Sequence, residues 1–208
     1  LPKVSTRALK KHIDVAHENG ISFNYLLNAI CMDNRELIGK TNKKIRAFVK
    51  FVEDCGADSV TVGSPSMVGL VKNVSPNLMV SSSVYNDADS LSRIKEWVGM
   101  GTDEMTLHYS YNRNFGKLEQ VLRTFPGTDF RLIANNVCLH ECPYRTNHAC
   151  SLAHASQSKH SSGGFFLDYY YLSCGHEKMQ NPVKLITADW IRPEDVHYYE
   201  ELCDKIGV

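Results

Sequence analysis

The chain has 208 residues, 43% of them hydrophobic and 22% charged, so it is long enough for one hydrophobic core or for part of one large domain. Lys plus Arg and Asp plus Glu both number 23, and a formal net charge of zero provides no overall basic field for nucleic acid. No apolar run of about 18 residues predicts a membrane span, and no signal-peptide pattern opens the chain. The seven cysteines are an odd number, which disfavours a fully paired disulfide framework, so we expect a reducing, cytoplasmic setting and no membrane partner.

Helical and strand-like segments alternate along the chain. Helices are predicted where apolar residues recur at three- or four-residue spacing, often next to a capping residue or a glycine, at 5–19, 42–55, 67–72, 87–98, 116–125 and 193–206. Strands are predicted for short apolar runs, at 21–32, 58–62, 78–82, 104–108, 130–137 and 183–186. This order predicts βαβ units and a parallel sheet.

Two architectures compete for this order of elements, the open doubly wound sheet and the (β/α)8 barrel. No G-x-G-x-x-G sequence follows a predicted strand, so the dinucleotide-binding fingerprint of many doubly wound folds is missing. Small or polar residues instead follow one strand after another, at Asn28, Ser64, Ser81, Ser82, Ser83, His108, Asn135 and Asn136. Active sites of barrels gather at the carboxyl ends of the strands, so we predict a TIM-like barrel with parallel strands.

The predicted barrel is incomplete at both termini. The sequence opens on a helix and ends just after one, and six strands cannot close an eight-stranded barrel. We expect a single partial barrel domain over 1–208, with a cysteine-rich metal-binding insertion at about 138–178. A partner chain that completes the barrel is one expected consequence, because an open sheet edge invites association.

Four cysteines in one stretch are the strongest chemical signal. Cys138, Cys142, Cys150 and Cys174 follow the spacing C-x3-C-x7-C-x23-C, and five of the nine histidines share this window. Four thiolates can hold an iron–sulfur cluster or a zinc ion. Because only the first pair is tightly spaced, we predict a 4Fe–4S cluster, with zinc as the alternative. Cys31, Cys55 and Cys203 are predicted to be packing residues, although Cys31 follows a strand and lies within reach of the barrel mouth.

Three further residues are candidates for catalysis. His108 ends a predicted strand and is suited to acid–base work, Asn136 to fixing a polar ligand, and Arg192 to holding a carboxylate. The alternatives are a hydrogen-bonded core histidine, a loop-capping amide and a solvated arginine. No G-x-S-x-G or H-E-x-x-H sequence is present, so no peptidase motif supports hydrolysis.

Two segments, FNYLLNAICMDNREL and ANNVCLHECPYRTNHACSLAHASQ, resemble the collagenase-like peptidase family U32, and ITADWIRPEDVHYYEELCDKIG fits the stretch that follows. The resemblance implies a TIM-like barrel and, in several branches, a 4Fe–4S cluster held by four cysteines. Members carry the peptidase name, whereas other branches act in oxygen-independent hydroxylation of RNA or of the ubiquinone ring, with prephenate as oxygen donor.

Three function classes follow from these observations. The first is an iron–sulfur enzyme that does redox or oxygen-transfer chemistry on a small molecule, an RNA base or a peptide, and it is the function we predict. The second is a peptidase or other hydrolase of the U32 type. The third is a non-catalytic metal-binding subunit whose open sheet binds a partner.

Overall fold

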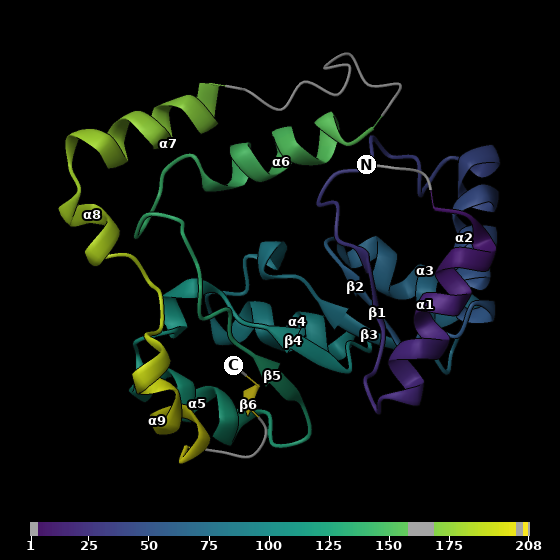
Figure 1. Cartoon of the computed structure of the whole chain (residues 1–208), viewed down its shortest axis with the longest axis horizontal. Helices are drawn as coiled ribbons and strands as arrows, with labels where there is room; N and C mark the ends of the chain where they lie inside the picture. The colour runs from purple at the N-terminus through teal and green to yellow at the C-terminus, as the bar shows by residue number, and fades with distance from the viewer. Residues whose placement is uncertain (1–3, 158–168, 203–205, 208) are drawn as a thin grey trace.

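The computed structural model describes residues 4–157, 169–202 and 206–207, and a single six-stranded parallel sheet organises them (Figure 1). The strands pair in chain order: β1 (Asn24–Leu27), β2 (Ser59–Val62), β3 (Met79–Ser82), β4 (Glu104–Thr106), β5 (Asp129–Arg131) and β6 (Ile206–Gly207). Consecutive strands that lie side by side, with helices between them, match a barrel rather than a doubly wound sheet, whose strand order reverses. The predicted partial TIM-like barrel is therefore confirmed, and its sheet is open.

Helix α1 (Thr6–Glu18) precedes β1, and α2 (Gly39–Asp54), α3 (Pro65–Val74), α4 (Leu91–Gly99) and α5 (Phe115–Thr124) each connect one strand to the next. Side-chain caps mark the starts of α1, α4 and α5: Ser5 Oγ accepts the N–H of Ala8 at 3.2 Å, and Ser90 and Asn114 cap α4 and α5 in the same way. The predicted helix at 87–98 begins later than expected, because Asp87 takes a left-handed conformation with φ of 54°. Two 3₁₀ turns, Val84–Asn86 and Tyr109–Tyr111, follow β3 and β4.

The hydrophobic core lies between the sheet and helices α2 to α5. Apolar side chains of the inner strands meet those of the helices, and the most completely buried include Val60, Val80, Met105, Phe130, Val49, Val52, Ile94 and Leu118. Full burial of one such side chain stabilises the fold by roughly 1.5–3 kcal/mol. Cys55, at the end of α2, is 4% exposed, which confirms its prediction as a packing residue, whereas Cys203 lies outside the described residues.

Two predicted elements near the C-terminus are wrong. The segment Val183–Ile186 is not a strand but a short helix, α8, and its side chains Val183, Leu185 and Ile186 are exposed. A short run rich in β-branched residues does not distinguish strand from helix, and Pro182 directly before it suits a helix start. The predicted helix 193–206 ends early: a 3₁₀ turn (Pro193–Asp195) and α9 (Val196–Glu200) precede the sixth strand at Ile206.

Between β5 and α9 the chain leaves the sheet and forms α6 (Arg145–Ala155), α7 (Tyr169–Gln180) and α8 (Figure 1). Helix α6 lies across the carboxyl ends of the strands. At its start, Arg145 donates to the carbonyl of Val84 after β3, and just past its end Gln157 donates to the carbonyl of Cys31 after β1. No helix in the described part of the chain is both long and apolar enough to cross a membrane.

The loop after β1 passes very close to the end of β2. A Cβ atom on Gly63 would lie 2.4 Å from the carbonyl oxygen of Asn28 and 3.0 Å from the carbonyl carbon of Ala29. Only a residue without a side chain fits against this backbone. Gly63 thus allows the loop that carries Cys31 to cross the sheet edge beneath α6.

Candidate metal centre and adjoining cleft

The structure divides the four predicted cysteine ligands between two places. Cys138, Cys142 and Cys174 line one cavity of about 390 Å³, whereas Cys150 lies beside Cys31 and His154. The helical phase of α6 causes this separation. His148, Ala149 and Leu152 face the cavity, and at about 100° per residue Cys150 and His154 emerge on the opposite side of the helix.

The cavity with three cysteines is held together by polar contacts from the loop after β5. Asn136 is buried, and its Oδ1 accepts the N–H of Cys138 at 3.1 Å. Glu141 takes a left-handed conformation with φ of 46°, in the turn between Cys138 and Cys142. Lys178 of α7 donates to the carbonyl of Val137 at 2.7 Å, next to the helix face that carries Cys174. Asn136, predicted to fix a ligand, therefore supports the loop that carries a cysteine.

His148 adds a fourth possible donor to this cavity. It lines the same space, and its Nε2 is buried without a hydrogen-bond partner among the described residues. A buried ring nitrogen without a partner is costly unless something binds it. Three sulfurs and one imidazole nitrogen are a donor set for zinc or for iron. These donor types suit a metal, but among the described residues only Cys31, Cys150 and His154 bring three ligand atoms within 4.8 Å of one another.

The surroundings of Cys138 keep its thiol neutral when nothing is bound. Burial raises the pKa of Cys138, the neighbouring Arg145 guanidinium opposes this rise, and Cys142 adds to it. Burial next to Cys138 also raises the pKa of Tyr109 well above its usual range. Metal binding by Cys138 would therefore release its proton.

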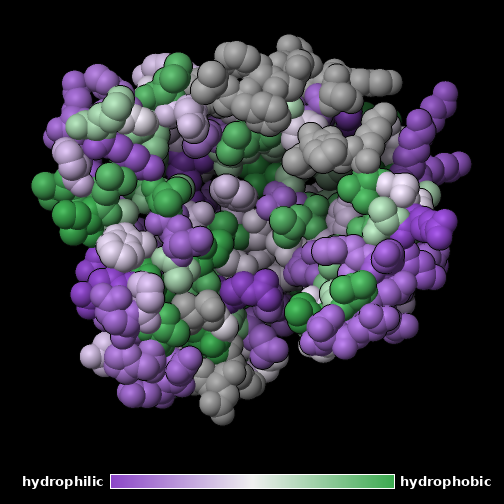
Figure 2. Space-filling model, viewed as in Figure 1, coloured by the Kyte–Doolittle hydropathy of each residue, from purple (hydrophilic) through white to green (hydrophobic). Residues whose placement is uncertain are grey.

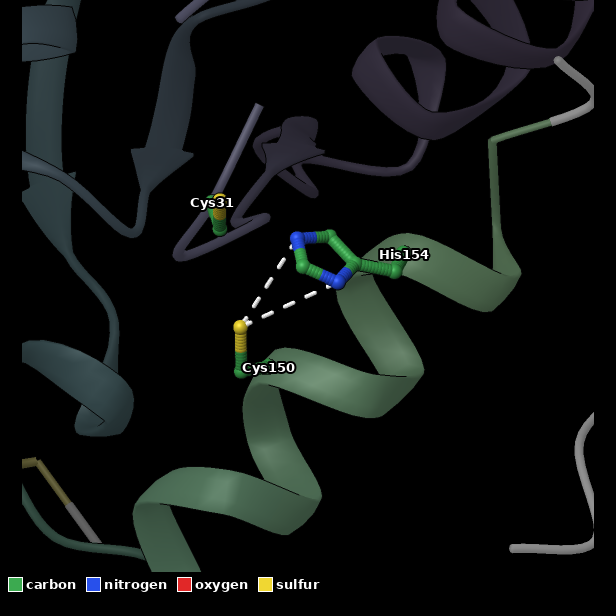
Figure 3. Close-up of side chains that lie close together, drawn as sticks. All are labelled: Cys31, Cys150 and His154. Carbon is green, nitrogen blue, oxygen red and sulfur yellow. Dashed lines mark hydrogen bonds between the residues drawn. The ribbon is translucent and has the colours of Figure 1, made fainter. Parts of the chain in front are cut away.

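The second group consists of Cys31, Cys150 and His154. Their ligand atoms all lie within 4.8 Å of one another, and in the part of the chain that the structure describes they form the one such group of three metal-ligand residues. Cys150 Sγ lies 3.7 Å from His154 Nε2, and both side chains extend from α6 toward the loop that carries Cys31 (Figure 3). Cys31 is half-buried at this edge, so it reaches the mouth of the partial barrel rather than packing in the core. This group could bind a metal.

A cleft of about 290 Å³ adjoins the cavity and contains the predicted catalytic residue His108. The Nδ1 of His108 accepts the N–H of Ser110 at 3.2 Å, which assigns the proton of the neutral ring to Nε2. Burial lowers the pKa of His108, and the positive charge of Arg145 lowers it further. At neutral pH the ring is therefore an uncharged hydrogen-bond donor rather than a cation.

Arg145 links the cleft to the cavity and was not predicted from the sequence. It lines both, it lies 5.2 Å above the ring of Tyr109, and its Nη1 pairs with Asp87 at 2.7 Å. Its Nε is buried without a partner among the described residues. Its position in the cysteine-rich stretch was the only sequence signal for it, because the pairing with Asp87 depends on the fold.

Arg192, the third predicted catalytic residue, is not part of this cleft. It lines a separate pocket with Arg113 and Tyr199, and its side chain binds Asp195 with two contacts of 2.7 Å. More than half of its side chain is exposed. Arg192 is therefore a surface arginine that forms an ion pair with Asp195, in the 3₁₀ turn that directly follows it.

A histidine and a carboxylate that sequence reasoning left aside meet at the same edge. His140 Nδ1 lies 2.8 and 3.0 Å from the two carboxylate oxygens of Asp189. Asp189 lines the cleft of His108, and His140 lines an adjoining pocket of about 610 Å³. Cys142 lines both the cleft and this pocket. An imidazole oriented by a carboxylate near a thiol is an arrangement also used in nucleophilic catalysis.

Comparison with known proteins gives the family. Residues 2–109, just over half of the chain, match the sequence profile of Peptidase family U32. The chain belongs to peptidase family U32. The U32 match ends at Tyr109, before the cysteine-rich stretch, so it includes Cys31 and His108 but none of the other candidate ligands.

One sequence relative and one solved structure are similar to this U32 chain. The "Uncharacterized protease MJ1657" of Methanocaldococcus jannaschii is 29% identical over 204 residues, which are 98% of this chain and 60% of that protein. The chain thus spans about three fifths of the length of its curated relative. The solved U32 peptidase Mk0906 superposes with a TM-score of 0.70 at 20% identity, over 100% of this chain and 77% of that structure.

Proposed function

We propose that this U32 chain is an iron–sulfur protein whose reaction takes place in the cleft of His108, beside a metal group held by Cys138, Cys142 and Cys174. The observation that carries the proposal is the cavity that these three cysteines line together with His148, whose buried Nε2 has no hydrogen-bond partner among the described residues. Donors of this kind, gathered at the carboxyl edge of a parallel sheet, lie where barrel enzymes place their active sites. The resemblance to iron–sulfur branches of the family points the same way.

A cluster bound there would supply electron transfer or Lewis-acid chemistry. His108 would donate a hydrogen bond from Nε2 to an oxygen atom of the substrate, because its Nδ1 is already engaged. Arg145, which lines both the cleft and the cavity, would place its positive charge beside an anionic group of the substrate. The candidate substrates remain a small molecule, an RNA base or a peptide.

Anaerobic purification followed by iron, sulfide and zinc analysis tests the proposal. Wild-type protein should contain iron and acid-labile sulfide. Cys138→Ala, Cys142→Ala and Cys174→Ala should each lose most of both, and His148→Ala should lower the iron content. Cys55→Ala is the matched control and should leave the iron unchanged, because Cys55 is buried at the end of α2 and lines neither the cavity nor the cleft. Full iron and sulfide in all three cysteine variants would contradict the proposal.

A second candidate function is peptide hydrolysis. It is favoured by the His140–Asp189 pair near Cys142 and by the protease and peptidase names of the two relatives. The comparison that separates the two functions is a peptidase assay on metal-free protein. Cleavage that persists without metal and disappears in His140→Ala would support the hydrolase, whereas no cleavage by the metal-free protein supports the iron–sulfur proposal.

A further inference from the structure

The group of Cys31, Cys150 and His154 is separated from the three-cysteine cavity by the width of helix α6. Cys150 and His154 are four residues apart and therefore project from the same side of the helix. The close-up in Figure 3 shows both side chains turned toward the loop that carries Cys31. The cavity of Cys138 is lined by the other side of α6, so one ion cannot bind both sets.

The distances in this group match the geometry of a zinc ion. Zinc binds cysteine sulfur at about 2.3 Å and histidine nitrogen at about 2.0–2.1 Å, and in a tetrahedron such ligands stand roughly 3.6 Å apart. The Cys150 Sγ and His154 Nε2 atoms are 3.7 Å apart, and Cys31 Sγ lies within 4.8 Å of both ligand atoms. Closing the group around an ion therefore requires side-chain movements of about 1 Å.

The backbone around Cys31 is held in place by contacts that do not involve its thiol. Gln157 Nε2 donates to the carbonyl oxygen of Cys31 at 3.1 Å, across 126 residues of sequence. Gly63 allows the preceding residues Asn28 and Ala29 to cross the end of β2. The third ligand is thus presented to α6 before any metal binds, which reduces the ordering cost of ligation.

We propose that Cys31, Cys150 and His154 bind a single zinc ion that is separate from the metal group of the Cys138 cavity. Two thiolates and one imidazole supply three of the four ligands that zinc takes. Two thiolates balance the charge of the divalent ion, which suits a half-buried position. The ion would join the loop after β1 to helix α6. The inference does not rest on the proposed iron–sulfur function.

Metal analysis of matched variants tests this proposal. Wild-type protein should bind one zinc ion per chain at this group, and Cys31→Ser, Cys150→Ser and His154→Ala should each lose that ion. Iron and sulfide should stay at the wild-type level in these variants, so that failure of the iron–sulfur proposal remains distinguishable. Cys55→Ala and His197→Ala serve as controls, and both should keep the zinc, because Cys55 is buried elsewhere and His197 is exposed on α9.

A measurement on the wild-type chain covers the case in which a variant fails to fold. Zinc should protect Cys31 and Cys150 from alkylation at least tenfold relative to chelator-treated protein, as mass spectrometry of the labelled peptides would show. Unchanged zinc content in the variants, equal alkylation with and without zinc, or a Cys31–Cys150 disulfide in anaerobically purified protein would overturn the proposal. Loss of iron and sulfide from Cys150→Ser would overturn it too, because Cys150 would then belong to the iron centre.

Discussion

The helices that flank the sheet and the helices that follow β5 are held in different ways. Each of α2 to α5 buries at least two large apolar residues against the strands, such as Ile94 and Trp97 of α4. Helix α6 buries only alanines among its described residues, and α7 and α8 bury none. Apolar side chains instead gather at the surface near α8, where Met179, Val183 and Ile186 are exposed (Figure 2).

Polar contacts take the place of a core in the second region. Arg145, Lys178 and Gln157 each donate to a main-chain carbonyl of a loop at the sheet edge. Single hydrogen bonds contribute only about 0.5–1.5 kcal/mol each, so the region depends on few contacts. Because ligation energy is also folding energy, metal bound by the cysteines would be a main source of order in this region. The sheet region needs no such ligand.

The largest expected effect is on the sheet region. Phe130 is 1% exposed in β5, and Phe130→Ala should lower the free energy of unfolding by about 3–5 kcal/mol, because it leaves a cavity in the core. Denaturant unfolding measures this change. Met179→Ala is the matched control in α7, where a 75% exposed side chain should cost less than about 0.5 kcal/mol. Equal losses in the two variants would show that the two regions are not held differently.

A smaller effect is expected where the two regions meet. Asn112 is fully buried, and its Nδ2 donates to the carbonyls of Ile133 at 2.9 Å and of Asp189 at 2.6 Å. Asn112→Ala leaves both acceptors without this donor and should lower the free energy of unfolding by about 1–3 kcal/mol. Hydrogen exchange should show the loss of protection around residue 189 as well as in the sheet. A loss confined to the sheet would mean that Asn112 does not connect the regions.

The smallest effect is a pH dependence at the cleft. Burial and the charge of Arg145 lower the pKa of His108 below the value of about 6.5 for an exposed imidazole. The unfolded chain therefore binds this proton more tightly, so stability from the neutral ring is complete above about pH 6.5 and declines as the pH falls toward the folded pKa.

His108→Asn keeps an acceptor for the Ser110 N–H but removes the titrating ring. The range from about pH 7 to about pH 5 brackets the ordinary histidine pKa. Over this range, the free energy of unfolding of the variant should fall less steeply than that of the wild type. Carboxylates such as Asp58 titrate in both proteins and cancel in the comparison. Parallel stability curves for the two proteins would contradict the lowered pKa of His108.

The sheet region could be predicted from the sequence, because burial determines its residue pattern. Val60 and Val80 lie in apolar runs that end in small polar residues, and each run is a strand where it was expected. The same reasoning failed at Val183–Ile186, where the apolar run contacts no sheet and folds as an exposed helix. Helix α6 was missed because alanines, rather than large apolar residues, form its buried face.

The sequence predicted where the candidate site lies but not which cysteines come together in it. Residues at the ends of parallel strands must share one edge, so His108 and the cysteines were expected there. Which cysteines meet depends on the phase of α6, and that phase is fixed by where the helix begins, at Arg145. The approach of Cys31 to Cys150 depends on a loop crossing between segments distant in sequence, which no local pattern reports.

Because of that crossing, Gly63 controls the distance between the metal ligands although it is not a ligand itself. Its missing side chain lets two main chains touch, with the carbonyl of Asn28 directly against it. Even one added methyl group would act as a wedge, lifting the loop and carrying the sulfur of Cys31 away from its partners on α6. The distance between Cys31 and its partners on α6 thus depends on the close contact of two main chains at Gly63. A substitution at position 63 would change this distance without changing any ligand.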